Sequence, residues 1–245
     1  MKISSITDTN KRDQNEDNRL IIPHKYKHKK MLLAAVFDGM GGTEAGEEAS
    51  RMAREGIEEW FTQHASSIAT ASMDRLKTEI TKLLIKINDD IYQYGLKIDK
   101  TLGTTSAILI IIGDEYIVAN IGDSRVYKFG SKNVQITKDQ TLAQLEVDRG
   151  NLTPEEAMTD KRSHTLTQSL GFIDQPEPDY FKGKCKRGDA FLLCSDGMYN
   201  RVLIENMAEV VKEKDLNTKE KLVQLAILSK AEGERDNITG ILIEI

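Results

Sequence analysis

Residues 31–39 read MLLAAVFDG, an apolar run that predicts a β-strand and ends in an aspartate followed by glycine. The same pattern recurs where YIVANIGD ends at Asp123 and where AFLLCSD ends at Asp196. A fourth aspartate, Asp236, stands just before the closing apolar segment ITGILIEI. Because strand ends in a sheet sandwich can meet at one rim, we expect these aspartates to lie close together.

Hydrophobic patterning extends outward from this strand. Further β-rich runs are expected at residues 2–6 and 19–22, followed by two amphipathic helices at about 43–64, with Thr43 as N-cap, and about 73–96. A second β-rich block covers residues 107–112, 116–121, 125–129 and 133–136. The short turns between these runs predict antiparallel pairing rather than a doubly wound parallel sheet.

The remaining segments complete an α+β layered sandwich. Residues 140–165 are polar and partly helical, with Thr153 as an N-cap before Pro154, and are interpreted as a surface excursion. The chain then returns to a strand at 190–194, a helix at about 217–230 and a strand at 238–245.

Composition limits the possible functions of the 245-residue chain. A net charge of −5 argues against a nucleic-acid binder, and two cysteines cannot form a disulfide framework. The N-terminus lacks the apolar core of a signal peptide, and the apolar run at 107–112 is too short to cross a bilayer. We therefore expect a cytoplasmic globular protein with no membrane partner.

Several carboxylates at one rim imply a cation. Like charges about 4 Å apart cost roughly 1 kcal/mol in water and several times more where partly buried. Glu16 and Asp17, which precede the strand at 19–22, add to the set. Ligand sets made only of oxygen favour Mg²⁺ or Mn²⁺. Any one Asp-Gly pair alone is better explained by a turn, so the metal hypothesis depends on their number.

Other catalytic motifs do not fit. A phosphate-binding loop starting at Gly41 would need lysine after Gly46, where the chain has Glu47. A cysteine phosphatase needs arginine six residues after its cysteine, but Asn200 stands there after Cys194. The histidines fit no zinc spacing and are expected at the surface; they are His24, His28, His64 and His164.

Six short motifs follow one another along the chain: Arg12-x-x-Asn15-Glu16-Asp17, Phe37-Asp38-Gly39-Met40-Gly41-Gly42, Gly103-Thr104-Thr105, Gly122-Asp123-Ser124-Arg125, Ser195-Asp196-Gly197 and Arg235-Asp236-Asn237-Ile238-Thr239. In this order they resemble the motifs of bacterial metal-dependent Ser/Thr protein phosphatases, the PPM or type 2C family. The resemblance covers essentially the whole chain. It implies one catalytic domain over residues 1–245, an α/β/β/α sandwich of two antiparallel sheets flanked by helices, with a flap subdomain at about 140–165.

The resemblance also implies a metal-ligand set with Mn²⁺ or Mg²⁺ as cofactor. Asp38 would bridge two core ions, with the Gly39 carbonyl on one of them. Asp196 and Asp236 would hold the other ion, and Asp123, with Asp196, would serve a weaker third.

The same resemblance implies the reaction. Arg12 would bind the phosphate, while Glu16 and Asp17 would act through metal-bound waters. Phosphoserine and phosphothreonine in proteins would be hydrolysed by a water or hydroxide bridging the metals, without a covalent intermediate. Expected partners are phosphorylated proteins, including a cognate Ser/Thr kinase, and the chain is expected to be a monomer.

Two departures from the family pattern concern specificity and proton donation. Met40 stands where animal members have a histidine proposed as general acid, and the flap is entered through Asp139-Gln140-Thr141 rather than Asp-His-Ser. Two other functions stay open. One is a catalytically weak regulator that binds phosphoproteins or a partner, and the other is a hydrolase of small phosphate compounds.

Overall fold

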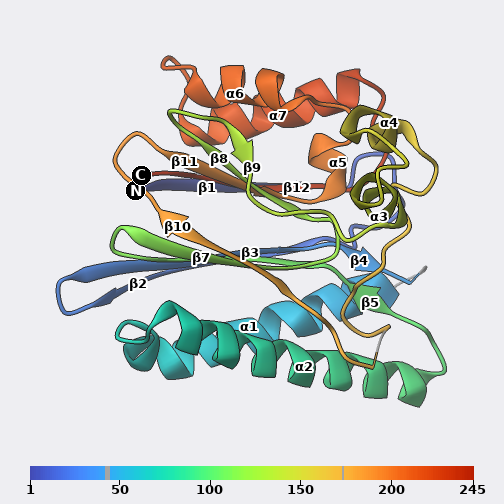
Figure 1. Cartoon of the computed structure of the whole chain (residues 1–245), viewed down its shortest axis with the longest axis horizontal. Coiled ribbons are helices and arrows are strands. Elements are labelled where there is room, and N and C mark those ends of the chain that lie inside the picture. Colours follow the sequence, from blue (N-terminus) through green and yellow to red (C-terminus); the bar gives the residue numbers. More distant parts are fainter. Residues whose placement is uncertain (42–44, 173) are drawn as a thin grey trace.

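The structure is a computed structural model that describes residues 1–41, 45–172 and 174–245. Within these residues, two five-stranded antiparallel sheets lie face to face (Figure 1). In spatial order the first sheet contains β1 (Lys2–Asp8), β12 (Ile238–Glu244), β11 (Ala190–Cys194), β8 (Arg125–Phe129) and β9 (Val134–Gln135). The second contains β10 (Asp179–Lys184), β7 (Glu115–Ile121), β6 (Ser106–Ile112), β3 (Lys29–Phe37) and β2 (Asn18–Tyr26). A small two-stranded sheet joins β4 (Gly39–Met40) to β5 (Gly103–Thr104).

Helices cover the outer face of each sheet (Figure 1). The second sheet is covered by α1 (Ala45–Ile68) and α2 (Met73–Ile98), and the first by α6 (Ile204–Lys212) and α7 (Thr218–Ala231). Three short helices lie at one end: α3 (Leu142–Asp148), α4 (Pro154–Thr159) and α5 (Asp196–Tyr199). This α/β/β/α arrangement confirms the predicted fold class. No helix in the described part of the chain is long and apolar enough to cross a membrane.

The central strand β3 is apolar throughout because both of its faces are covered. Leu32, Ala34 and Val36 belong to the core between the two sheets. Leu33 and Ala35 alternate with them and pack into the core under α1 and α2. A strand with no face in water loses the usual alternation of apolar and polar residues, although this sheet is antiparallel.

Most predicted elements are present with shifted ends, and some were not predicted. The first long helix is Ala45–Ile68 rather than about 43–64, and Thr43, its expected N-cap, lies outside the described residues. The Thr153 N-cap is confirmed and forms a capping box with Glu156. Strand β10 was not predicted because it is a partly exposed edge strand with a weak apolar pattern. Helices α5 and α6 are short and were also missed.

Both sheets bring the aspartate-bearing ends of their strands to the same end of the sandwich. Asp38 follows β3, Asp123 follows β7, Asp196 follows β11, and Asp236 precedes β12. The opposite end carries both chain termini (Figure 1). The antiparallel topology therefore positions a site at one rim only.

Candidate active site

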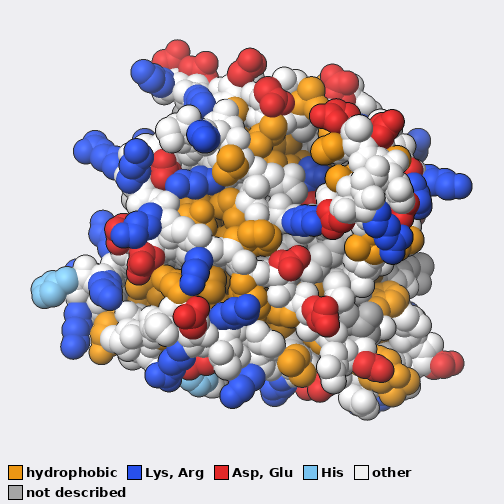
Figure 2. Space-filling model, in the orientation of Figure 1, with side chains coloured by type: hydrophobic (Ala, Val, Ile, Leu, Met, Phe, Trp, Pro, Cys, Tyr) orange, Lys and Arg blue, Asp and Glu red, His pale blue; other side chains and the backbone are white. Residues whose placement is uncertain are grey.

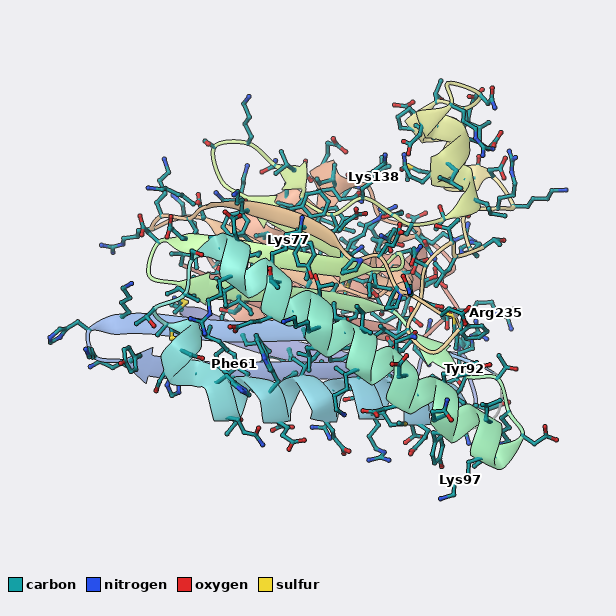
Figure 3. The ribbon with its side chains drawn as sticks, turned by 60° about the horizontal axis from the view of Figure 1, so that its bottom comes forward. Phe61, Lys77, Tyr92, Lys97, Lys138 and Arg235 are labelled. Atoms are coloured by element: carbon teal, nitrogen blue, oxygen red, sulfur yellow. The ribbon has the colours of Figure 1, made fainter. Side chains whose placement is uncertain are left out.

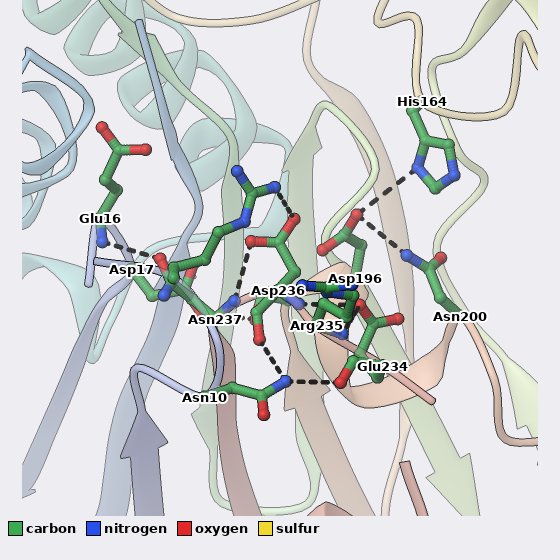
Figure 4. A network of polar contacts seen from close by, with 12 residues as sticks. Asn10, Glu16, Asp17, His164, Asp196, Asn200, Glu234, Arg235, Asp236 and Asn237 are labelled. Atoms are coloured by element: carbon green, nitrogen blue, oxygen red, sulfur yellow. Dashed lines mark hydrogen bonds and ion pairs between the residues drawn. The ribbon is translucent and has the colours of Figure 1, made fainter. Parts of the chain in front are cut away.

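A cleft of about 1060 Å³ opens at the aspartate-bearing rim. Its lining includes every predicted site residue except Asp17: Arg12, Glu16, Asp38, Gly39, Asp123, Asp196 and Asp236. Asp17 is buried, and its carboxylate accepts a hydrogen bond of 2.7 Å from the Ser195 hydroxyl. Figure 4 shows Glu16 and Asp17, from the N-terminal part of the sequence, in one network of polar residues with Asp196 and Asp236 from its C-terminal part.

The carboxylates lie at different depths. Asp123 is 7% exposed, whereas the Asp236 side chain is 33% exposed. Burial, followed by the charges of neighbouring aspartates, raises the pKa of Asp38 and of Asp123 well above the usual value. Burial also raises the pKa of Asp17 to about 7. The fold therefore concentrates acidic groups where their negative charge is unfavourable without a cation.

These residues fit a cation that prefers oxygen. The candidate side-chain ligands are all carboxylates, and Glu16 Oε1 is buried without a hydrogen-bond partner. In the described part of the chain, no group of three or more His, Cys, Asp or Glu side chains is close enough together to hold a metal ion. The acids share a cleft, so water and backbone carbonyl oxygens would complete any coordination shell.

The backbone around Asp38 is fixed by hydrogen bonds and close packing. The N–H of Asp38 donates to Thr105 Oγ1 at 2.9 Å. The carbonyl of Asp38 accepts from the Thr105 N–H at 2.9 Å and from Thr104 Oγ1 at 3.0 Å. A Cβ on Gly39 would collide with the carbonyl oxygens of Gly46 and Glu16. Glycine is needed here for this close approach and not for a left-handed turn, because Gly39 has no positive φ.

Asparagine side chains join the two chain segments that carry Arg12 and Asp236. Asn237 Nδ2 donates to the carbonyls of Thr9 and Gln14, and Asn237 Oδ1 accepts from the Glu16 N–H at 2.9 Å. Asn10 Nδ2 in turn donates to the carbonyl of Asp236 at 2.9 Å. Sequence reasoning quoted Asn237 only as part of a motif and gave it no role. These contacts make it a positioning residue for the loop that carries Arg12.

Arg12 does not stand free in the cleft. Its Nη2 lies 2.6 Å from Asp236 Oδ2, and its side chain is 58% exposed. The hydrogen bond with Asp236 raises the pKa of Arg12 above its usual value. Phosphate and Asp236 would therefore compete for one guanidinium group.

A half-buried cation, Arg125, fixes the turn that carries Asp123. Arg125 lies 3.6 Å from the ring centre of Tyr199 and is paired with Asp139 at 2.6 Å. The Tyr199 hydroxyl donates to the carbonyl of Asp123 at 2.9 Å. This network, which sequence reasoning missed, joins the Asp123 turn, helix α5 and the entry to residues 140–165.

Residues 140–165 border the cleft through the end of α4 and the segment that follows it. The lining residues from this part are Met158, Thr159, Asp160, Lys161, Ser163 and His164. His164 was expected to be an ordinary surface histidine and is 63% exposed, yet its Nδ1 lies 3.7 Å from Asp196 Oδ2. Gln140 fixes the start of residues 140–165, because its Oε1 accepts a hydrogen bond of 2.9 Å from the Gly122 N–H.

The structure argues against two alternative chemistries. Cys194 is fully buried in β11, and this burial raises the pKa of its thiol, so it is unsuited to act as a nucleophile. Phe37 and Tyr199, the aromatic residues near the motifs, are also buried, so neither presents a face for stacking a nucleotide.

The fold and its acidic cleft define the class of metal-dependent protein phosphatases. A family model described as protein phosphatase 2C matches residues 10–227, and the chain belongs to that family. It is 31% identical over 236 residues to a serine/threonine phosphatase, stp, of Listeria innocua, covering 95% of this chain and 91% of the relative.

Solved structures agree with this assignment. The crystal structure of the Staphylococcus aureus serine/threonine phosphatase Stp1 superposes with a TM-score of 0.89 at 28% identity, covering 99% of this chain and 94% of the other. The catalytic domain of the serine/threonine protein phosphatase PstP, in complex with two manganese ions, superposes with a TM-score of 0.80 at 28% identity, covering 99% of this chain and 97% of the other.

Proposed function

We infer that this chain is a metal-dependent serine/threonine protein phosphatase. The observation that carries the inference is the cleft in which carboxylates from four strand ends meet Arg12. Membership in the protein phosphatase 2C family supports it, as does the relative that binds manganese. Arg12 and the site carboxylates are all present, which favours turnover over a regulator that only binds.

We propose the metal ligands from the resemblance to the family, and the shared cleft supports this assignment. Asp38 and the Gly39 carbonyl would hold the core Mn²⁺ or Mg²⁺ ions, together with Asp196 and Asp236. Asp123 would serve a weaker third site with Asp196. When bound, the ions would lower the pKa of an attacking water and offset charge on the phosphoryl oxygens. Glu16 and Asp17 would orient waters around this centre.

Arg12 would orient the phosphoryl group. Its planar guanidinium can donate two hydrogen bonds to phosphoryl oxygens, an arrangement that lysine cannot reproduce. Met40 lines the cleft, but its thioether side chain has no ionisable proton to donate. The leaving serine or threonine oxygen would therefore take its proton from water held there. No side chain forms a covalent bond to phosphorus in this scheme.

The likeness to bacterial phosphatases supports further proposals about context. We propose that the chain acts as a monomer in the cytoplasm, where its two buried thiols would stay reduced. Its substrates would be phosphoproteins, including a cognate Ser/Thr kinase. Residues 140–165 would act as a flap subdomain that borders the bound peptide.

The first test is phosphate release from a phosphothreonine peptide, with and without Mn²⁺, by the native chain and by Asp38→Asn. Release that requires Mn²⁺ and is lost in the variant supports both the activity and the position of Asp38. No release by the native chain at any Mn²⁺ concentration would favour the regulator. Release of phosphate from free phosphoserine but not from the peptide would favour a small-molecule hydrolase.

A further inference from the structure

The charges that line the cleft are separated by depth. Among the acidic groups on its floor, Asp123 is buried, and Asp38 and Asp196 are half-buried. Four cationic side chains that also line the cleft are all exposed, and we call them the basic rim: Lys11, Lys161, Arg201 and Arg235. The cleft therefore presents a negative floor, suited to cations, beneath a positively charged opening.

The rim cations come from four separate segments of the chain. Lys11 directly precedes Arg12, and Arg235 directly precedes Asp236. Arg201 follows α5, and Lys161 follows α4. Arg235 lies at the outer edge of the molecule (Figure 3). Because the four cations come from separate segments that all line the cleft, they do not form one local run of charge.

Carboxylates of the described residues form no ion pairs with this rim, although the charge of Lys161, after hydrogen bonds from Arg162, helps to lower the pKa of Asp160. Within the described residues, none of the four cations forms an ion pair, whereas the neighbouring Arg162 is paired with Asp160 at 2.9 Å. Glu234 also lines the cleft, but its carboxylate accepts hydrogen bonds from the backbone N–H groups of Arg235 and Asp236. Unpaired surface cations around a shared opening attract and orient anionic ligands.

We propose that the basic rim selects phosphopeptides that carry a second anionic group beside the phosphorylated residue. This proposal rests on the proposed phosphatase function. The phosphorylated side chain would reach down to Arg12 and the acidic floor, leaving its flanking residues at the height of the rim. The second group is a carboxylate or another phosphoryl group, because lysine and arginine bind either.

The test compares phosphothreonine peptides of one length that differ only in their flanking residues: aspartate, alanine, lysine, or a phosphonate that cannot be hydrolysed. We expect kcat/KM for the aspartate peptide to exceed that for the lysine peptide about tenfold at low salt. The ratio should shrink as salt rises, because screening acts on exposed charges. The phosphonate peptide shows which anion is preferred.

Two double variants of the basic rim test whether the rim causes this preference. Arg201→Gln with Arg235→Gln should reduce the aspartate-to-lysine ratio to about twofold, and Lys11→Gln with Lys161→Gln should change it in the same direction. The matched control is Lys25→Gln with Lys132→Gln, which removes the same charge from exposed positions near the opposite end of the sheets. Basic side chains gather over that end in Figure 2, and the control should keep the native ratio.

The outcomes separate this proposal from the function on which it rests. If the native chain has the same kcat/KM for all four peptides, the role of the rim is overturned and the phosphatase function stands. The same holds if both rim double variants leave the aspartate-to-lysine ratio unchanged. An equal fall in the ratio for the control pair would also overturn it, because net charge would then be the cause. No release from any peptide with Mn²⁺ present would overturn both proposals.

Discussion

The two ends of the sheet sandwich treat charge in opposite ways. At the end that carries the termini, Lys221 lies 2.6 Å from Glu244 and Lys128 lies 2.9 Å from Asp189. At the cleft end, Arg12 pairs with Asp236, but the charges that act most on the pKa of Asp38 are those of four other aspartates. One end therefore stabilises the fold through paired charges, whereas the other keeps repelling charges together for binding. Sites of this kind commonly reduce stability in favour of function.

The largest expected effect comes from removing the central charge of the cleft. Asp38→Asn should lower kcat on a phosphothreonine peptide by roughly 10³-fold or more, because an amide cannot replace the carboxylate that we propose as a metal ligand. In a chelating buffer the same variant should melt about 2–4 °C higher, since roughly 1 kcal/mol of repulsion is relieved. Thermal melts of both proteins, with chelator and with Mn²⁺, measure the two effects.

The control for this variant is the native chain, whose melting temperature should rise when Mn²⁺ is added. A smaller rise is expected for Asp38→Asn. If the variant melts below the native chain in chelator, the carboxylate stabilises the fold and the contrast between the two ends is wrong.

The second effect concerns the ion pair between Arg12 and Asp236. Arg12→Ala should lower kcat/KM on phosphopeptides by about 30- to 100-fold, because a charged donor to the phosphoryl group is lost. Arg12→Lys should recover only part of this loss. Because Arg12 occupies Asp236 Oδ2 in the structure, Arg12→Ala should also lower the Mn²⁺ concentration needed for half-maximal activity. A higher requirement for Mn²⁺ would show that the pair does not compete with the metal.

The sequence predicts the floor of the cleft better than the contacts that support it. Runs such as MLLAAVF locate buried strands, and each floor aspartate stands next to one of them, so local patterns suffice. The role of Asn237 depends on bonds to Thr9 and Gln14, more than 200 positions earlier in the chain. No local period encodes such a contact, since it exists only once β1 pairs with β12.

Three further misses have the same physical origin. Strand β10 pairs only with β7 at the edge of its sheet, so half of its pattern is set by solvent and resembles a loop. The stacking of Arg125 on Tyr199 joins residues far apart in sequence. His164 resembles a surface histidine in the sequence, and only the path of residues 140–165 brings it near Asp196.

A smaller effect should follow from removing Asp123, the proposed ligand of the third ion. Asp123→Ala should lower turnover by about tenfold while the core ions stay bound, because Asp38 and Asp236 remain in place. The count of Mn²⁺ bound per chain, measured beside activity, tests this separation. Full activity would remove Asp123 from the reaction. Loss of all bound Mn²⁺ would instead place it in the core site.

The smallest effect is expected at the opposite end and should leave activity unchanged. Burial acts to raise the pKa of Glu244, but hydrogen bonds from Lys221 and Thr218 lower it below the usual value. Glu244→Gln leaves the Lys221 ammonium, whose side chain is only 7% exposed, without its charged partner. We expect a loss of about 1 kcal/mol in the free energy of unfolding at pH 7, measured by denaturation in urea.

The dependence of this loss on pH identifies its cause. A carboxyl group with a lowered pKa in the folded state stabilises the fold above its unfolded pKa of about 4.3, and this contribution disappears as the pH falls through the lower folded value. The difference in the free energy of unfolding between Glu244→Gln and the native chain should therefore be constant from about pH 6 to about pH 8. It should vanish in more acidic buffer. A difference that persists there would come from altered packing. A fall in phosphatase activity would instead show that the two ends of the sandwich are coupled.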